Sequence, residues 1–191
     1  MHGLVQSSRV FRMSREKAMP NWSFIGMAFM LRLVEPFRKP KHRLIQVGLK
    51  PGQTVLEYGI GVGSYTIPAA RLLGETGCLY ALDIHPLAIK TVGKRLDREH
   101  LGNVTFILSD RDTGLPDESV DVILLYDTLH LVQDKQALLA EMHRVLKADG
   151  LLSADHHHTD RKVLLETVTA GDRFRLQSES GHVYGFAKAR Y

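Results

Sequence analysis

The sequence contains one cysteine, Cys78, so it cannot form a disulfide within the chain. Nothing in the cysteine content implies export, and Cys78 lies in a predicted strand, where a core role is favoured over a nucleophilic one. No apolar run approaches the roughly 20 residues that span a bilayer. Repeats and low-complexity tracts are also missing. The 191 residues are enough for one domain with a substantial core.

Positive charge is concentrated near the start of the sequence. Residues 1–48 contain nine Lys or Arg and two acidic residues, whereas the rest of the chain is net acidic. We predict that residues 1–20 form a basic, mobile tail, and a solvated tail is favoured over a segment that guides a polyanion. These residues lack the apolar stretch of a secretory signal, so we expect a cytoplasmic protein.

Residues 21–48 are predicted to form a helical arm. The first helix, over 22–35, could be capped by Asn21 and ended by Pro36. It is apolar nearly all round and is therefore expected to bury more than one face. A short second helix is expected at 41–47. The arm could serve as a lid over a substrate pocket, as a packing element or as a contact in a homodimer, and a membrane-surface role is a weaker alternative.

A glycine-rich segment follows the first predicted strand of the main domain. The strand, near 53–58, is followed by Gly59, Gly61 and Gly63 and then by a helix-compatible run at 64–73. Glycines allow close approach to the backbone, and the N–H groups at the start of a helix point toward a ligand. The pattern therefore favours a nucleotide-like cofactor, although a tight turn without a ligand is the alternative.

Two residues distinguish this segment from the glycine loop of NAD-binding proteins. Ser64 occupies the position where the NAD pattern has Gly or Ala, and Glu57 places a carboxylate two residues before the first glycine. A buried carboxylate is costly unless it meets a cation or hydrogen-bond donors. The α-ammonium group of an amino acid would satisfy Glu57. A cofactor that joins a nucleoside to an amino acid therefore fits better than a dinucleotide.

Carboxylates end four successive predicted strands. Besides Glu57 they are Asp83, the last residue of 78–83, Asp110 after 103–108 and Asp127 after 120–125. The carboxyl ends of parallel strands share one edge of a sheet, where ligands bind. Asp83 is placed to accept hydrogen bonds from ribose hydroxyls, and it could also cap the helix predicted at 86–99, since the two roles do not exclude each other. Asp110 could accept from an adenine amino group.

The alternation of strands and helices predicts a doubly wound α/β domain. Further elements are a helix near 134–147, a strand near 150–155 and a short helix near 160–169. The last two strands, 173–177 and 182–187, are joined by 178–181 in a predicted hairpin. Little chain remains for a separate substrate domain, so the acceptor pocket is expected to come from the arm and from loops after the fourth and fifth strands.

These residues resemble the class I S-adenosylmethionine-dependent methyltransferases, in particular the small-molecule type 11 branch, which includes quinone-pathway enzymes. The resemblance covers residues 51–150 and is carried by the following segments: 55–63, Asp83, 108–110, 115–123 and 138–150. It implies a Rossmann-like, seven-stranded, mostly parallel sheet in a methyltransferase domain spanning 49–191, with the hairpin as its antiparallel edge. One departure is the short passage 112–114, which leaves little room for a helix between the third and fourth strands.

The resemblance implies S-adenosylmethionine as cofactor and a set of residues that bind it. Those residues are Glu57, Gly59, Gly61, Gly63, Asp83, Ile84, Asp110, Arg111 and Tyr126. The single cysteine argues against the arsenite methyltransferases, which resemble this core but need several thiols.

Methyl transfer from a sulfonium needs mainly alignment of the acceptor, with at most a modest base. The candidate catalytic residues are Asp127, His130 and His156, although His130 could equally be a core or capping histidine. On an extended segment the side chains of His156 and His158 would converge, and with Asp155 nearby they could hold a metal ion. A polar loop rim is favoured over a metal site, so no metal is predicted.

The residues after the fourth strand limit the acceptor. Tyr126-Asp127-Thr128-Leu129 differs from the Asn/Asp-Pro-Pro-Tyr/Phe motif of enzymes that methylate adenine in DNA or glutamine in release factors. We therefore expect a small-molecule acceptor and no DNA. An RNA or protein methyltransferase, with the basic arm guiding a polyanion, and a non-catalytic protein that binds the cofactor are the alternatives.

Overall fold

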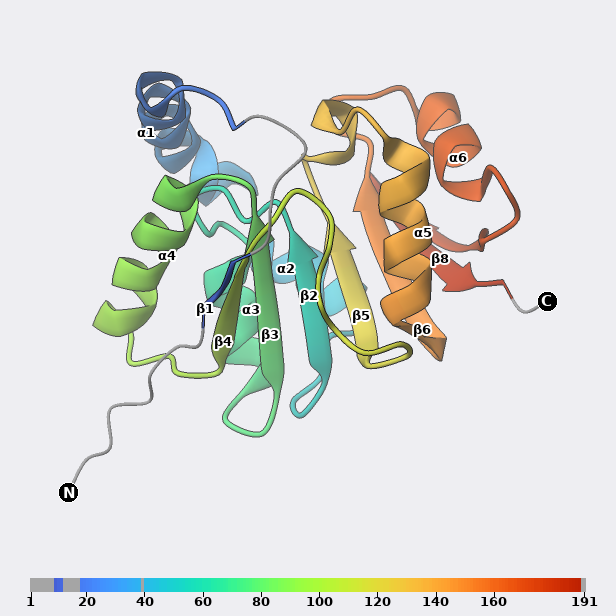
Figure 1. Cartoon of the computed structure of the whole chain (residues 1–191), viewed down its shortest axis with the longest axis horizontal. Helices are drawn as coiled ribbons and strands as arrows, with labels where there is room; N and C mark the ends of the chain where they lie inside the picture. Colours follow the sequence, from blue (N-terminus) through green and yellow to red (C-terminus); the bar gives the residue numbers. More distant parts are fainter. Residues whose placement is uncertain (1–8, 12–17, 39, 190–191) are drawn as a thin grey trace.

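A computed structural model describes residues 9–11, 18–38 and 40–189, which form an α/β domain around one mixed sheet (Figure 1). The strand order is β1-β4-β3-β2-β5-β6-β8-β7, with β1 to β6 parallel and β8 antiparallel to both of its neighbours. The strands are β1 (Arg9–Phe11), β2 (Thr54–Tyr58), β3 (Cys78–Asp83), β4 (Val104–Leu108), β5 (Val120–Leu125), β6 (Leu146–Asp155), β7 (Phe174–Ser180) and β8 (Val183–Lys188).

Helices cover both faces of the sheet. They are α1 (Asn21–Arg38), α2 (Pro40–Gln46), α3 (Thr66–Leu73), α4 (Pro86–Arg98), the 3-10 turn η1 (Leu129–Leu131), α5 (Lys135–Val145) and α6 (Arg161–Thr169). Figure 1 shows α5 in front of the sheet and α2 and α3 behind it. Among the described helices, none has the length and hydropathy that a membrane-spanning segment requires.

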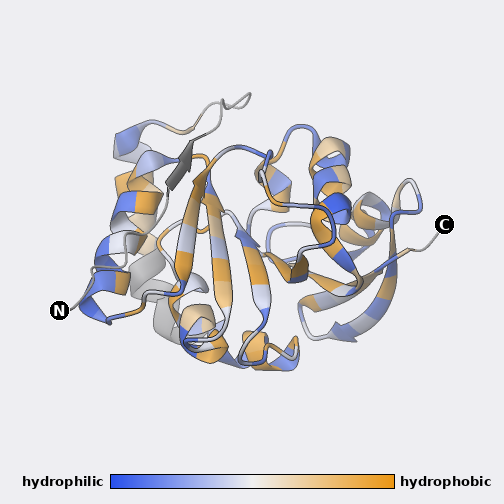
Figure 2. Ribbon diagram, turned by 60° about the horizontal axis from the view of Figure 1, so that its bottom comes forward, coloured by the Kyte–Doolittle hydropathy of each residue, from blue (hydrophilic) through white to orange (hydrophobic). Residues whose placement is uncertain are grey.

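The core consists of two clusters, one on each face of the sheet. Val55 in β2 packs with residues of α3 and α4, whereas Leu56, the next residue, packs with residues of α5 and α6. Successive side chains of a strand point to opposite faces, so a strand covered by helices on both sides must be apolar throughout. Figure 2 shows this apolar colouring along the central strands. The burial fixes the register of β2 and therefore the position of the loop that follows it.

The predicted seven-stranded sheet with an antiparallel C-terminal hairpin is confirmed as β2 to β8. As the sequence indicated, residues 109–119, between β4 and β5, contain no helix. The structure adds β1, whose Arg9 lies opposite Phe106 of β4. The prediction of a tail over 1–20 is therefore wrong for residues 9–11, while residues 1–8 and 12–17 lie outside the described part of the chain.

Three local expectations are corrected. Helix α1 does not end before Pro36 but runs to Arg38. The hairpin turn consists of Gly181 and His182, because β7 continues to Ser180. Among the described side chains of α1, which lie in its first half, Phe24 is buried, but four large apolar side chains are exposed, so this half of the helix does not bury more than one face. The four are Trp22, Ile25, Phe29 and Met30.

Candidate cofactor and acceptor site

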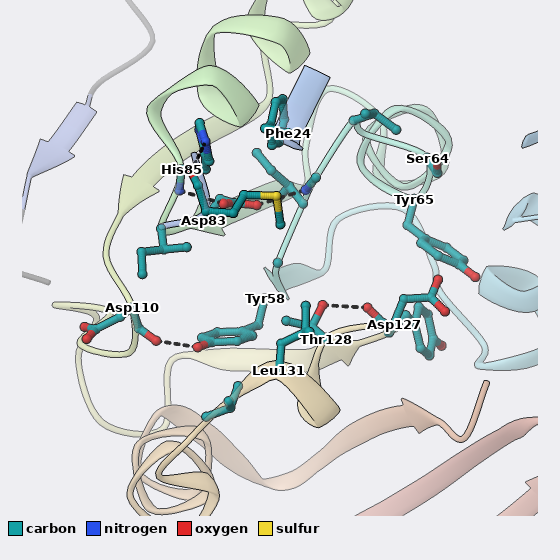
Figure 3. A pocket seen from close by; sticks show the side chains of 18 residues that line it. Phe24, Tyr58, Ser64, Tyr65, Asp83, His85, Asp110, Asp127, Thr128 and Leu131 are labelled. Carbon is teal, nitrogen blue, oxygen red and sulfur yellow. Dashed lines mark hydrogen bonds between the residues drawn. The ribbon is translucent and has the colours of Figure 1, made fainter. Parts of the chain in front are cut away.

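A cavity lies at the carboxyl ends of β2, β3, β4 and β5 (Figure 3). It is bounded by the glycine loop after β2, by the first residues after the three neighbouring strands and by the start of α1. Its lining residues are Met19, Phe24, Tyr58, Gly59, Ile60, Gly61, Val62, Ser64, Tyr65, Asp83, Ile84, His85, Asp110, Tyr126, Asp127, Thr128, Leu131 and Val132. The predicted sheet edge is therefore where the cavity is found.

The three loop glycines have different roles, although all have positive φ angles. A Cβ atom on Gly59 would lie 2.3 Å from Thr128 Oγ1, and one on Gly63 would lie 3.0 Å from Val92 Cγ2. A Cβ atom on Gly61 would have no other atom within 4 Å, and this residue lines the cavity. Gly59 and Gly63 thus allow the loop to pack against the protein, while Gly61 leaves the backbone open to a ligand.

Asp83 presents a fixed carboxylate at the end of β3. Its Oδ2 accepts a hydrogen bond from the Gly61 N–H at 2.9 Å, and its Oδ1 accepts one from the His85 N–H at 2.7 Å. Burial raises the pKa of this carboxyl, and the two backbone donors oppose that shift. The N-cap of helix α4, a role that the sequence also allowed for Asp83, is His85, whose Nδ1 accepts a hydrogen bond from the Leu87 N–H. Asp83 is left to face the cavity and can accept further hydrogen bonds from hydroxyls.

His85 joins the start of α1 to the cavity wall. Because its Nδ1 accepts from Leu87, its Nε2 carries the proton and donates to the Met19 carbonyl at 3.0 Å. Its ring stacks on Phe24, with ring centroids 4.4 Å apart. All three of Met19, Phe24 and His85 line the cavity. The beginning of the N-terminal arm therefore closes one side of the site.

Glu57 is buried beneath the loop and does not itself line the cavity. Desolvation, with the nearby Asp83 carboxylate, raises the pKa of Glu57 to about 8. Its Oε2 accepts no hydrogen bond. A carboxyl in such surroundings is protonated at neutral pH unless a cation approaches, so Glu57 has the properties expected of a group that receives an ammonium ion.

The part of the cavity beside β4 is apolar with polar atoms at its edge. Asp110 and Ile84 line it, and the Tyr58 hydroxyl donates to the Asp110 carbonyl. Arg111, also predicted to bind the cofactor, does not line the cavity, and its guanidinium lies 3.5 Å from Asp134 Oδ2. A flat ring with an exocyclic amino group would match these surfaces.

On the opposite side of the loop, two tyrosines form an aromatic wall. The rings of Tyr65 and Tyr126 lie 4.7 Å apart, and the Tyr126 hydroxyl is hydrogen-bonded to Ser153 Oγ at 2.6 Å. Burial raises the pKa of Tyr126, so its hydroxyl stays protonated. Arg43 donates to the Tyr65 hydroxyl at 2.8 Å. This wall is suited to an apolar or aromatic acceptor.

Histidines surround Asp127, which lines the cavity and has a φ of +54°. Asp127 Oδ1 lies 3.6 Å from His158 Nε2, and the His158 ring packs on His130 with centroids 4.7 Å apart. Burial and the neighbouring His158 lower the pKa of His130, which favours its neutral form. Neither His130 nor His158 lines the cavity, so among the predicted catalytic residues only Asp127 does so.

The predicted convergence of His156 and His158 is wrong. Thr159 donates its N–H to the His156 carbonyl at 3.1 Å, so these residues form a turn and their side chains do not alternate as on a strand. His156 Nδ1 lies 2.9 Å from the Tyr184 hydroxyl, and its Nε2 lies 2.7 Å from His182 Nδ1. His156 therefore belongs to a separate pair beside β8 and does not reach the cavity.

Several cavity residues were missed by sequence reasoning. They are Met19, Phe24, Tyr58, Ile60, Val62, Ser64, Tyr65, His85, Thr128, Leu131 and Val132. Only His85 carried a usable signal, because it lies two residues after the strand-terminal Asp83 and directly precedes Pro86, the first residue of a helix. The contacts of Met19 and Phe24 join segments distant in sequence, which no local pattern could indicate.

Comparison with known proteins agrees with this geometry. Residues 49–187 match the sequence model of a methyltransferase domain family. A protein from Marinomonas sp. (strain MWYL1) named ubiquinone/menaquinone biosynthesis C-methyltransferase UbiE is 32% identical over 143 residues, which are 74% of this chain and 57% of that protein. The protein of the same name from Teredinibacter turnerae is 37% identical over 62% of this chain and 49% of its own. The chain thus spans about half the length of these curated relatives.

Solved structures share the fold. A SAM-dependent methyltransferase from Aquifex aeolicus has a TM-score of 0.74 and 24% identity, with 91% of this chain and all of that chain covered. A putative S-adenosyl-L-methionine-dependent methyltransferase from Methanococcus maripaludis has a TM-score of 0.69 and 13% identity, with 93% and 97% covered. The family match and the shared architecture place the chain in the methyltransferase domain family, with the class I S-adenosylmethionine-dependent fold.

Proposed function

We propose that this chain binds S-adenosylmethionine in the cavity and transfers its methyl group to a small organic acceptor. The observation that carries the proposal is the Asp83 carboxylate, which is held by the N–H groups of Gly61 and His85 beside an open glycine backbone. Hydroxyls of a ribose are the donors that such a carboxylate accepts at the end of the second strand of this fold. Membership of the methyltransferase domain family supports the same cofactor.

The remaining parts of the cofactor have matching surroundings. Asp110 would accept from the adenine amino group, and Ile84 would pack against the adenine ring. Glu57 has the buried, unpaired carboxyl oxygen that an α-ammonium group would satisfy. When bound, the cofactor supplies an electrophilic methyl group that needs no further activation.

The chain's own contribution is then to hold the acceptor and remove its proton. Tyr65 and Tyr126 offer an aromatic wall for an acceptor ring, and the neutral Tyr126 hydroxyl can donate a hydrogen bond. Asp127 is the candidate base at this wall, with His130 and His158 close to it as proton acceptors. The relatives' name includes C-methylation in quinone biosynthesis, so a phenolic or quinone-like acceptor is our first choice.

Equilibrium binding of tritiated S-adenosylmethionine tests the cofactor site. We expect Asp83→Ala to weaken binding by about tenfold to a hundredfold, the equivalent of one or two lost hydrogen bonds to a charged group. Asp149→Asn, at an exposed position of β6, is the matched control and should bind as wild type. Equal affinity in wild type and Asp83→Ala would contradict the assigned site.

The acceptor class is tested by incubating the protein and labelled cofactor with small phenols, quinone precursors or total RNA. We expect label in the small-molecule fraction. RNA labelling that is lost on deleting residues 1–20 would instead support the alternative in which the basic segment guides a polyanion. A cytoplasmic location is part of the proposal and is tested by cell fractionation.

A further inference from the structure

Five of the ten histidines of the chain gather at the carboxyl ends of β5, β6 and the start of β8. Their ring contacts link His130 to His158, His158 to His157, and His157 to His182, which also contacts His156. The proposed methyl-transfer chemistry uses Asp127 as its base and His130 and His158 as proton acceptors, which leaves His156, His157 and His182 without a role. The number of imidazoles therefore calls for a separate explanation.

We infer that Asp127, His157 and His158 form a binding site for a divalent transition-metal ion, with Zn²⁺ as its representative. One ligand atom from each of the three residues lies within 4.8 Å of the other two. Two imidazoles and one carboxylate are a donor set that zinc and similar ions accept. Mg²⁺ and Ca²⁺ prefer oxygen ligands, so the two histidines disfavour them.

The spacing of the ligand atoms suits such an ion. Ligands bound at about 2.0–2.1 Å in a tetrahedron lie about 3.4 Å apart. His158 Nε2 and Asp127 Oδ1 are already 3.6 Å apart. His157 and His158 are exposed, so their side chains can rotate toward a shared ion without disturbing the core.

The backbone that carries these ligands is held in place. Asp155, whose side chain is 2% exposed, accepts from the Asp127 N–H at 2.9 Å and from Arg43 at 3.1 Å. This carboxylate joins the segment after β5 to the end of β6, two residues before His157. The ligands therefore come from neighbouring strand ends whose relative position does not depend on the ion, as preorganised metal sites require.

The site would lie beside the acceptor. Asp127 lines the cavity, so an ion held by it would be within reach of a molecule bound there. Three protein ligands leave one tetrahedral position open, which an oxygen atom of the acceptor could occupy. This consequence rests on the proposed function, whereas the binding of the ion does not.

Metal titration of tag-free, chelator-treated protein tests the inference. We expect one Zn²⁺ per chain by calorimetry and visible absorption bands of a low-symmetry site when Co²⁺ is used as the probe. The double variant His157→Ala/His158→Ala should weaken Zn²⁺ binding by at least about a hundredfold, and Asp127→Asn by about tenfold. His182→Ala removes a neighbouring imidazole outside the ligand set and should bind Zn²⁺ as wild type.

Two results would overturn the inference. One is Zn²⁺ binding by wild type that is no tighter than binding by the double variant. The other is an equal loss in His182→Ala, which would show that the assigned ligands are wrong. Thermal unfolding and S-adenosylmethionine binding are measured on every variant, and each single histidine variant serves if the double variant is unstable. Wild-type protein that binds Zn²⁺ but not the cofactor would contradict the proposed function alone.

Discussion

At the residue scale, Glu57 has to be considered together with the cofactor. The sequence predicted that this buried carboxyl needs a cation, and the structure leaves its Oε2 without a hydrogen bond. The free protein avoids a buried negative charge because burial raises the pKa to about 8 and keeps the group protonated at neutral pH. A cationic ligand would reverse that preference, so binding and protonation at Glu57 are expected to be coupled.

Glu57→Gln is expected to change how stability depends on pH in the absence of cofactor. The folded protein holds this proton up to about pH 8, whereas the ordinary value of 4.5 applies to the unfolded chain. The wild type therefore loses stability as pH rises from 4.5 to 8, and the glutamine variant does not lose this part. Each unit of pKa shift corresponds to about 1.4 kcal/mol. Between these two pH values the stability of wild type should therefore fall by a few kcal/mol relative to that of the variant.

Urea unfolding at pH 5 and pH 8 measures this difference. At pH 8 the free energy of unfolding of Glu57→Gln should rise relative to that of wild type. The variant should also bind S-adenosylmethionine more weakly. Glu75→Gln, at an exposed position after α3, is the control and should show no such gain. A pH-independent difference between Glu57→Gln and wild type would contradict the account.

Gly59 provides a second test at this scale. Gly59→Ala would bring a Cβ atom to 2.3 Å from Thr128 Oγ1 at a φ of +82°. We expect destabilisation by about 2–4 kcal/mol, from overpacking and from the left-handed backbone together. Gly61→Ala meets no atom within 4 Å and should cost only about 1 kcal/mol, while still weakening cofactor binding.

Urea midpoints of both variants, repeated in a Thr128→Ala background, check this prediction. Removal of the Thr128 hydroxyl and methyl groups should restore part of the stability lost in Gly59→Ala and none of that lost in Gly61→Ala. Equal destabilisation by the two glycine variants would be incompatible with the proposed division of roles.

At the scale of elements, the sequence was most informative where burial on both faces dictates composition. Apolar runs that end in an acid predicted β2, β3, β4 and β5 and the edge at which their carboxylates meet. The short strand β1 could not be predicted, because three residues carry no periodic pattern. The turn at 156–159 could not be predicted either, since its direction depends on a backbone hydrogen bond rather than on residue type.

Helix α1 shows that an apolar composition on all sides does not by itself predict which side chains are buried. Composition suggested burial on several sides, but among the large apolar side chains described in this helix the structure buries only Phe24, which stacks on His85. We expect Phe24→Ala to speed dissociation of S-adenosylmethionine by about threefold to tenfold, the usual value of an aromatic pair.

Stopped-flow dissociation measures this effect. Phe29→Ala, on the same helix but 67% exposed, is the control and should dissociate like wild type. Equal rates for Phe24→Ala and wild type would show that the start of α1 does not close the site.

At the scale of the whole molecule, α1 presents an apolar surface formed by Trp22, Ile25, Phe29 and Met30, with Ile45 of α2 also exposed. Monomeric proteins rarely expose large contiguous apolar patches. We therefore expect a homodimer through this surface, in agreement with one of the roles that the sequence allowed for the arm.

Sedimentation velocity over a range of concentrations tests the dimer. Phe29→Glu should shift the protein to monomer, whereas Val163→Glu, on the exposed side of α6, should leave it dimeric. A wild type that sediments as a monomer throughout would contradict the expectation.

A crystal structure with S-adenosylhomocysteine tests the central claim most directly, because this product of methyl transfer retains the ribose, the adenine and the amino acid of the cofactor. The account predicts ribose oxygens within hydrogen-bond distance of Asp83, the adenine beside Ile84 and Asp110, and the ammonium group directed toward Glu57. A ligand bound elsewhere, or a cavity that stays empty at saturating ligand, would contradict it.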